Sequence, residues 1–70
     1  MNETPFALKG NHIMLTSLLK ASNIGATGGH AGLLILEGEV KVNGEVEHRK
    51  RRKLRVGDRV EVFDQMIIIV

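Results

Sequence analysis

The hydrophobic period of this chain changes at Gly38, and this change limits what the chain can form. Before Gly38, apolar residues recur every three or four positions, the spacing of a helix with one buried face. After Gly38, apolar and polar residues alternate, which is the spacing of a strand. Glycine also tolerates the left-handed conformation that ends many helices. The sequence therefore predicts an α+β fold in which two short helices pack on a small antiparallel sheet.

Two helices are predicted before Gly38. The apolar stripe of the first consists of Met14, Leu15, Leu18 and Ala21 (or Ser22). This helix is predicted to end at Asn23, because asparagine adopts positive φ more readily than most residues. Thr27 is the predicted N-cap of the second helix, where its hydroxyl can accept a hydrogen bond from a free amide. The inward-facing residues of the second helix are expected to be Ala31, Leu34 and Ile35.

Strands are predicted on both sides of the helix pair. Residues 1–5 are expected to be loose, and residues 6–8 to form an edge strand or an extended arm. After Gly38, Asn43-Gly44 predicts a hairpin turn. Placing Val46 opposite Val42 requires a three-residue loop or a bulge, which we prefer to a two-residue loop. The remaining strand signals are the alternation of Val60 with Val62, after a turn at residues 56–59, and the β-prone run 66–70, expected to be buried in the sheet.

Length and composition narrow the class of protein. A chain of 70 residues is expected to form a single domain over residues 1–70, with a small core. It has no cysteine, which excludes disulfides and thiolate metal sites. We recognise no signal segment, and no apolar run approaches the ~20 residues of a membrane span. The sequence thus predicts a cytoplasmic protein without a membrane partner. A core this small leaves little room for a water-excluding pocket, so no enzyme activity, small-molecule substrate or cofactor is expected.

One short segment concentrates the positive charge. Residues 49–55 hold six of the ten basic side chains and no acidic one. Like charges this close repel one another, so a folded segment that keeps them is expected to gain something from a partner. Arginine outnumbers lysine four to two, which suits forked contacts to phosphate oxygens. The run therefore predicts a polyanion partner, bound with a steep salt dependence. The alternative is a solvated segment that only maintains solubility.

The scarcity of aromatic residues bears on the kind of nucleic acid. Proteins that bind open single strands usually stack bases on aromatic side chains. This chain has two, Phe6 and Phe63, and both are expected in the core. The sequence therefore favours contact with the backbone and shape of folded RNA.

Two further features are weaker signals. Gly28 and Gly29 open the predicted second helix, where free amides beside Thr27 could hold a phosphate; a flexible helix start is the alternative. The three histidines fall on three different predicted elements without cysteine or paired carboxylates, so no metal site is predicted. They are His12, His30 and His48. Asp58, which follows Gly57, is interpreted as a turn residue.

These residues resemble a known family, the RNA-binding domain of ribosomal small-subunit protein four, here called the S-four domain. The resemblance rests on Thr27-x-x-x-Ala31-x-x-Leu34-Ile35-x-x-Gly38-x-Val40-x-Val42-Asn43-Gly44, followed by Gly57-Asp58-x-Val60. Residues 6–9, 18–20 and 27–31 look most similar to the small stand-alone bacterial form, the YbcJ-like proteins. The resemblance covers nearly the whole chain.

The resemblance implies an α+β module that presents a basic surface to structured RNA. In this family, Ser-Arg usually stands at the start of the second helix, and the arginine contacts RNA. Here Thr27 and Gly28 stand there, so contact at that corner would fall to His30, Lys20 or backbone amides. The predicted RNA-binding residues are Lys20, His30, Lys41, Arg49, Lys50, Arg51, Arg52, Lys53 and Arg55.

The sequence therefore predicts a non-catalytic protein that binds structured RNA. The expected partners are ribosomal RNA, within the ribosome, or transfer RNA. One alternative is a winged helix-turn-helix that reads duplex DNA, but the second helix lacks the Arg, Asn or Gln that reads bases in the major groove. Another is a protein-interaction or sulfur-carrier module. Carriers of that kind need a Gly-Gly C-terminus, whereas this sequence has Ile67-Ile68-Ile69-Val70 there.

Overall fold

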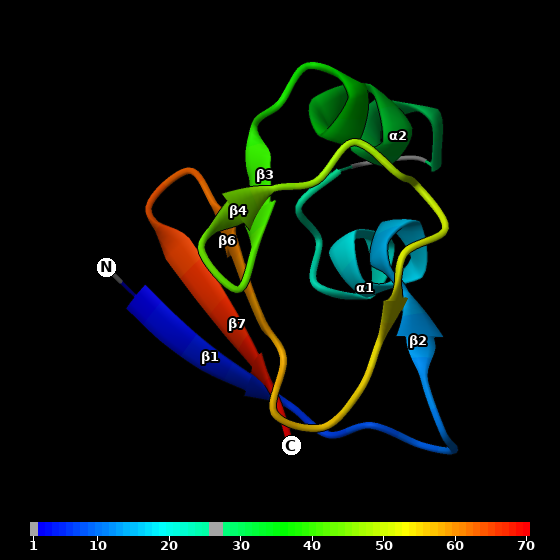
Figure 1. Cartoon of the computed structure of the whole chain (residues 1–70), viewed down its shortest axis with the longest axis vertical. Helices are drawn as coiled ribbons and strands as arrows, with labels where there is room; N and C mark the ends of the chain where they lie inside the picture. The colour runs from blue at the N-terminus through cyan, green and yellow to red at the C-terminus, as the bar shows by residue number, and fades with distance from the viewer. Residues whose placement is uncertain (1, 26–27) are drawn as a thin grey trace.

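A computed structural model of the chain describes residues 2–25 and 28–70 (Figure 1). Its two helices and seven strands are, in chain order, β1 (Asn2–Phe6), β2 (Ile13–Met14), α1 (Leu15–Ala21), α2 (Gly28–Leu36), β3 (Val40–Val42), β4 (Glu45–Val46), β5 (Lys53–Leu54), β6 (Arg59–Val62) and β7 (Gln65–Ile69). None of the helices in these described ranges is long and apolar enough to cross a membrane.

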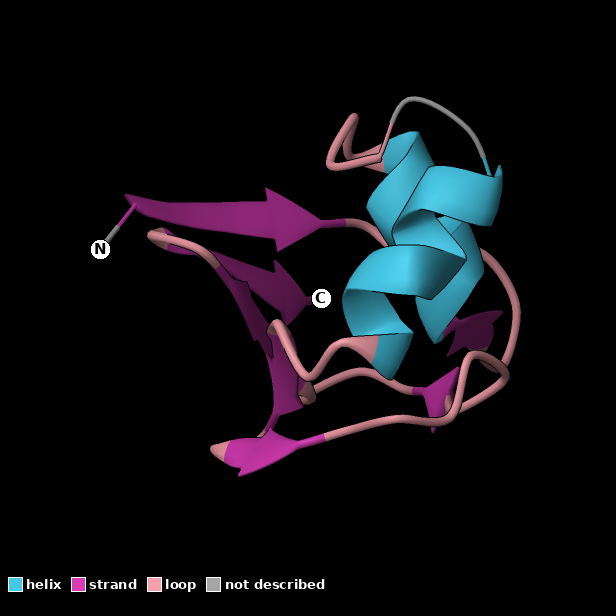
Figure 2. Ribbon diagram, turned by 90° about the horizontal axis from the view of Figure 1, so that it is seen from above, coloured by secondary structure: helices cyan, strands magenta, loops and turns pink. Residues whose placement is uncertain are grey.

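The strands form two sheets, and the helices lie on one side of the larger one. The five-stranded sheet has the order β1-β7-β6-β3-β4, and β2 pairs with β5 in a separate two-stranded sheet. Both helices face the inner side of the large sheet (Figure 2), where alternate strand residues are buried. The core consists of Leu15, Leu18, Leu19, Ile24, Ala31, Leu34, Ile35, Val40, Val42, Leu54, Val60, Val62, Ile67 and Ile69. The predicted α+β class is confirmed.

The large sheet is mixed, not purely antiparallel as predicted. Strand β1 pairs in parallel with β7, from Asn2 opposite Gln65 to Phe6 opposite Ile69. Residues 2–5, expected to be loose, therefore belong to a strand. Pro5 fits there because β1 is an edge strand, where a residue without an N–H group does not interrupt a ladder on both sides. The burial of β7 between β1 and β6 agrees with the prediction for the last strand.

The β3–β4 hairpin has the two-residue loop that we did not prefer. Val42 pairs with Glu45, and Lys41 pairs with Val46. Asn43 and Gly44 both have positive φ (53° and 87°), as the tight type I′ turn requires. This turn preference determines the register, and Val46 is left 47% exposed on the outer face. As a consequence, Glu47 falls on the inner side of the sheet with Val40, the residue whose carbonyl accepts a hydrogen bond from its backbone amide.

The C-terminal ends of the helices agree with the predictions from the sequence more closely than their N-terminal starts do. Asn23 has φ of 58° just after α1, and Gly38 has φ of 79° just after α2. Met14 and Ala21, predicted on the buried stripe of α1, are exposed, and Leu19 is buried instead. Met14 belongs to β2, a two-residue strand too short to show a period. The predicted cap Thr27 lies outside the described residues.

Phe63 is exposed, contrary to the expectation that both phenylalanines belong to the core. Phe6 packs partly buried against the core, but Phe63 is 61% exposed. Phe63 and Asp64 form the two-residue connection between β6 and β7, whose flanking residues Val62 and Gln65 are paired. Phe63 has φ of 55°. The alternation of Val60 and Val62 does not extend beyond the strand, so it could not predict whether Phe63 is buried.

Candidate nucleic-acid interface

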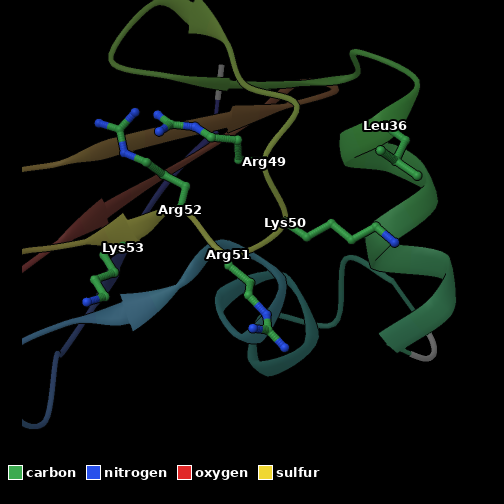
Figure 3. A pocket seen from close by; sticks show the side chains of 6 residues that line it. All are labelled: Leu36, Arg49, Lys50, Arg51, Arg52 and Lys53. Atoms are coloured by element: carbon green, nitrogen blue, oxygen red, sulfur yellow. The ribbon is translucent and has the colours of Figure 1, made fainter.

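The predicted basic run forms one wall of an open pocket. Arg49 to Arg52 lie in the connection between β4 and β5, and Lys53 begins β5. These five residues and Leu36 of α2 line a pocket of about 770 Å³ (Figure 3). In Figure 3, Arg49 and Arg52 point in the same direction, Lys50 reaches toward α2, and Arg51 and Lys53 extend along other directions. The run thus presents its cations over a broad surface.

A buried carboxylate anchors the start of the run. Glu47 is 8% exposed. Its Oε2 atom accepts hydrogen bonds from the backbone amide (3.1 Å) and Nε (3.0 Å) of Arg49, and its Oε1 atom accepts from Arg49 Nη2 (3.0 Å). Arg52 donates a fourth hydrogen bond through Nη1 to Oε1, at 2.8 Å. One acidic group therefore fixes two of the guanidinium groups and offsets part of their charge.

The protonation of Glu47 reflects this arrangement. The hydrogen bond from the Arg49 side chain is the largest effect on the Glu47 carboxyl, and with Arg52 it outweighs the opposing effect of burial. Together these contacts lower the pKa of Glu47 from 4.5 to about 2. The carboxylate therefore stays charged throughout the neutral range. Both contacts are ion pairs, with N–O distances of 3.0 Å for Arg49 and 2.8 Å for Arg52.

The backbone of the run is held against the start of α1. The carbonyl of Arg52 accepts a hydrogen bond from the Leu15 amide (2.9 Å), and the carbonyl of Lys50 accepts one from the Thr16 amide (3.2 Å). Free amides at a helix start need such acceptors, and Met14, at the N-cap position, makes no side-chain cap. After the run, Leu54 is fully buried. The cationic segment is therefore a shaped part of the fold.

Lys50 packs its aliphatic stem across α2. A Cβ atom added to Gly32 would lie 3.2 Å from Lys50 Cε and 3.3 Å from Lys50 Cδ. Gly32 therefore provides the space over which the lysine lies, while the ammonium group remains at the surface. Leu36, one helical turn further along α2, is exposed and lines the same pocket.

Asn43 and Asp58, two residues of the motif on which the family resemblance rests, connect the turn between β3 and β4 to the turn before β6. Asn43 Oδ1 accepts a hydrogen bond from the Arg59 amide (3.0 Å), and Asn43 Nδ2 donates to Asp58 Oδ1 (3.1 Å). Asp58 Oδ2 accepts from the Arg55 amide at 2.8 Å. Burial acts to raise the pKa of Asp58, but these hydrogen bonds lower it overall. The interpretation of Asp58 as a turn residue is confirmed.

The structure brings together only part of the predicted set. Arg49, Lys50, Arg51, Arg52 and Lys53 share the pocket, but the other four predicted cationic or histidine residues do not line it. Lys20 is exposed at the end of α1, and Lys41 lies opposite Val46 and Glu61 on the outer side of the sheet. His30 belongs to a different pocket, and Arg55 follows β5. These remaining residues are Lys20, His30, Lys41 and Arg55.

The predicted phosphate site at the start of α2 is described only in part. Gly28 and Gly29 do open α2, whereas Thr27 lies outside the described residues. Their contact with phosphate stays a prediction.

Three residues of the site were not predicted from the sequence. Glu47 was missed because its burial depends on the two-residue hairpin loop. Gly32 and Leu36 were also missed, and their spacing of four on α2 was the available signal.

Comparisons with known proteins agree with the motif resemblance. A family model described as the S4 domain matches residues 6–70. The chain is 39% identical over 62 residues to an Escherichia coli (strain K12) protein named "Putative RNA-binding protein YbcJ", covering 89% of each chain. It is 40% identical over 58 residues to a Bacillus subtilis (strain 168) protein named "Probable ribosome maturation protein RlbA", covering 83% of this chain and 82% of that protein. The chain therefore belongs to the S4 domain family.

Proposed function

We propose that this protein is a non-catalytic, cytoplasmic RNA-binding protein that docks on structured RNA, either ribosomal or transfer RNA. The observation that carries the proposal is the fixed display of five consecutive cationic residues, 49–53, around one pocket. A pre-shaped cationic surface loses little entropy on binding a polyanion and fits the regular phosphate spacing of a folded nucleic acid. Lys20, His30, Lys41 and Arg55 would provide further contacts at the edges.

The names of two relatives also support RNA binding. The name of the E. coli relative refers to RNA binding, and the name of the B. subtilis relative refers to ribosome maturation. We infer that the present protein contacts ribosomal RNA in a maturing ribosome. Transfer RNA is the second candidate. Duplex DNA is the competing ligand.

The structure indicates which cations to change. Arg49 and Arg52 hold Glu47, so their removal would leave a buried carboxylate without partners and damage the fold. Arg51 and Lys53 are exposed, and neither forms an ion pair within the described residues. Neutralising these two tests the charge of the surface without dismantling its support.

We expect the double variant Arg51→Gln/Lys53→Gln to bind structured RNA about 30-fold more weakly than the native protein at 0.1 M salt. Each lost phosphate contact removes about 0.7–0.9 from the slope of log K against log salt, so two contacts reduce the slope by about 1.5. The measurement is fluorescence anisotropy with labelled ribosomal RNA fragments, transfer RNA and duplex DNA from 0.05 to about 0.5 M salt.

A matched control variant is Lys9→Gln/Arg59→Gln, which removes one lysine and one arginine outside the run. Its affinity and salt slope should stay within about twofold of the native values, apart from the general effect of net charge. Equal losses in the two variants would show that net charge, and not this surface, governs binding. Equal affinity of the native protein for duplex DNA and structured RNA would contradict the choice of ligand.

A further inference from the structure

A second pocket lies on the other side of α2, and Phe63 forms part of it. Its volume is about 510 Å³, within the usual range for ligand sites. The β6–β7 turn supplies Phe63, β7 supplies Gln65, and Asn23 comes from the segment after α1. His30 and Leu34 supply the side formed by α2. We propose that this pocket receives one unpaired base of the bound RNA, with the base stacked on the ring of Phe63; the inference rests on the proposed function.

The conformation of Phe63 is the first argument. A bulky residue with φ of 55° is an outlier, because this region favours glycine or asparagine. Phe63 gains little burial in exchange, since the residue is 61% exposed. An unfavourable backbone conformation that presents an apolar ring to solvent is typical of a functional position. Phe63 is therefore better explained by a partner than by the stability of the turn.

The chemistry of the pocket favours a base as that partner. The carboxamides of Asn23 and Gln65 can each donate and accept hydrogen bonds, as the edges of all four bases require. Leu34 supplies apolar surface beside the ring. Among the described residues that line the pocket, none is acidic, so no carboxylate of the lining itself repels a polyanion; Asp64, between Phe63 and Gln65, is exposed to solvent. Unpaired bases of folded RNA are bound in this way, by aromatic stacking and contacts to base edges.

The position of the pocket relative to the cationic run is the third argument. Residues 32 and 36 of α2 face the run, whereas residues 30 and 34 face the Phe63 pocket. At 100° per residue, these two pairs lie on opposite sides of the helix. The helix is about 10 Å wide, a span of about three nucleotides at 3.4 Å per stacked base. One RNA lying over α2 could thus place phosphates against the run and a base in the pocket.

The experiment uses the full chain and three labelled hairpin RNAs: one fully paired, one with a single-nucleotide bulge, and one with an abasic residue in the bulge. Stacking on an aromatic ring accepts every base, so the bulge needs no particular sequence. Phe63→Asn removes the ring and tolerates the positive φ. Phe63→Trp keeps a ring and introduces the only tryptophan of the chain. Thermal unfolding establishes that both variants fold.

We expect the native protein to prefer the bulged RNA about 10-fold over the other two hairpins, within the range measured for base stacking. Phe63→Asn should bind all three equally, with the native salt slope. The emission of Phe63→Trp should be quenched by the bulged RNA and unaffected by the abasic one.

A native-like preference for the bulge in Phe63→Asn would overturn the proposal, and so would unchanged tryptophan emission of Phe63→Trp at saturation with bulged RNA. If Arg51→Gln/Lys53→Gln loses affinity while Phe63→Asn loses none, the RNA interface stands and the base pocket is refuted. If the native protein binds none of the hairpins, both are refuted. Self-association that Phe63→Asn abolishes, without any effect on RNA binding, would assign the pocket to a second copy of the chain and refute the base.

Discussion

Replacing Glu47 with alanine is expected to lower the free energy of unfolding by about 3 kcal/mol at pH 7, the lower end of the range for breaking a buried ion pair. The lower end applies because the Arg49 side chain is 72% exposed and remains hydrated after the change. A 70-residue domain has a total stability of about 4–10 kcal/mol. The variant should therefore retain about 1–7 kcal/mol and unfold at a clearly lower urea concentration than the native protein, as urea denaturation followed by circular dichroism would show.

The pH dependence of stability gives an independent check on the same group. Because the pKa of Glu47 is about 2 in the folded protein and 4.5 ordinarily, its charge stabilises the fold fully above pH 4.5. This contribution is lost as the pH falls from 4.5 toward 2. Glu47→Gln has a similar shape without the charge, so the native protein should exceed it in stability at pH 7, and the difference should shrink at pH 3. A constant difference between these pH values would contradict the role assigned to the Glu47 carboxylate.

Much of the fold could be predicted from the sequence because the relevant signals are local. The helix ends at Asn23 and Gly38 and the Asn43-Gly44 turn all depend on which residues tolerate positive φ, and all three agree with the structure. The parallel pairing of β1 with β7 joins residues more than 60 positions apart, and no local period indicates it. Proline is uncommon inside strands, and Pro5 is accommodated because β1 lies at the edge of the sheet.

The cationic run could be predicted from the sequence, but the buried Glu47 carboxylate that holds two of its arginines could not. Charge density alone identified residues 49–53, whereas the burial of Glu47 follows from a hairpin register that differs by one residue from the one we preferred. A shift of one residue exchanges the two faces of a strand, so the same choice that exposes Val46 buries Glu47. The exposure of Phe63 depends likewise on a turn conformation that is unfavourable for phenylalanine, and propensity cannot predict such an exception.

Gly25→Ala is expected to lower the free energy of unfolding by about 3 kcal/mol, near the upper limit for inserting one methyl group into a packed site. A Cβ atom at this position would lie 2.9 Å from the backbone nitrogen of Ala31 and 3.0 Å from its Cα and Cβ atoms. Ala31 is fully buried in α2. The contact therefore involves backbone in the core, which cannot move without displacing the whole helix. Thermal and urea denaturation of the variant measure the effect.

Gly32→Ala is the matched control, since it adds the same methyl group inside α2 itself. There the nearest atoms belong to the flexible end of Lys50, at 3.2 and 3.3 Å, and can move aside. The change also replaces glycine in a helix with alanine, which favours the helix by about 1 kcal/mol. Gly32→Ala should thus be at least as stable as the native protein, while Gly25→Ala is much less stable. Similar losses in both would mean that the Lys50 stem is packed as rigidly as the core. In that case the cationic run and α2 would form one stiff surface, and Lys50 could not adjust its position to the phosphates that we propose as its partners.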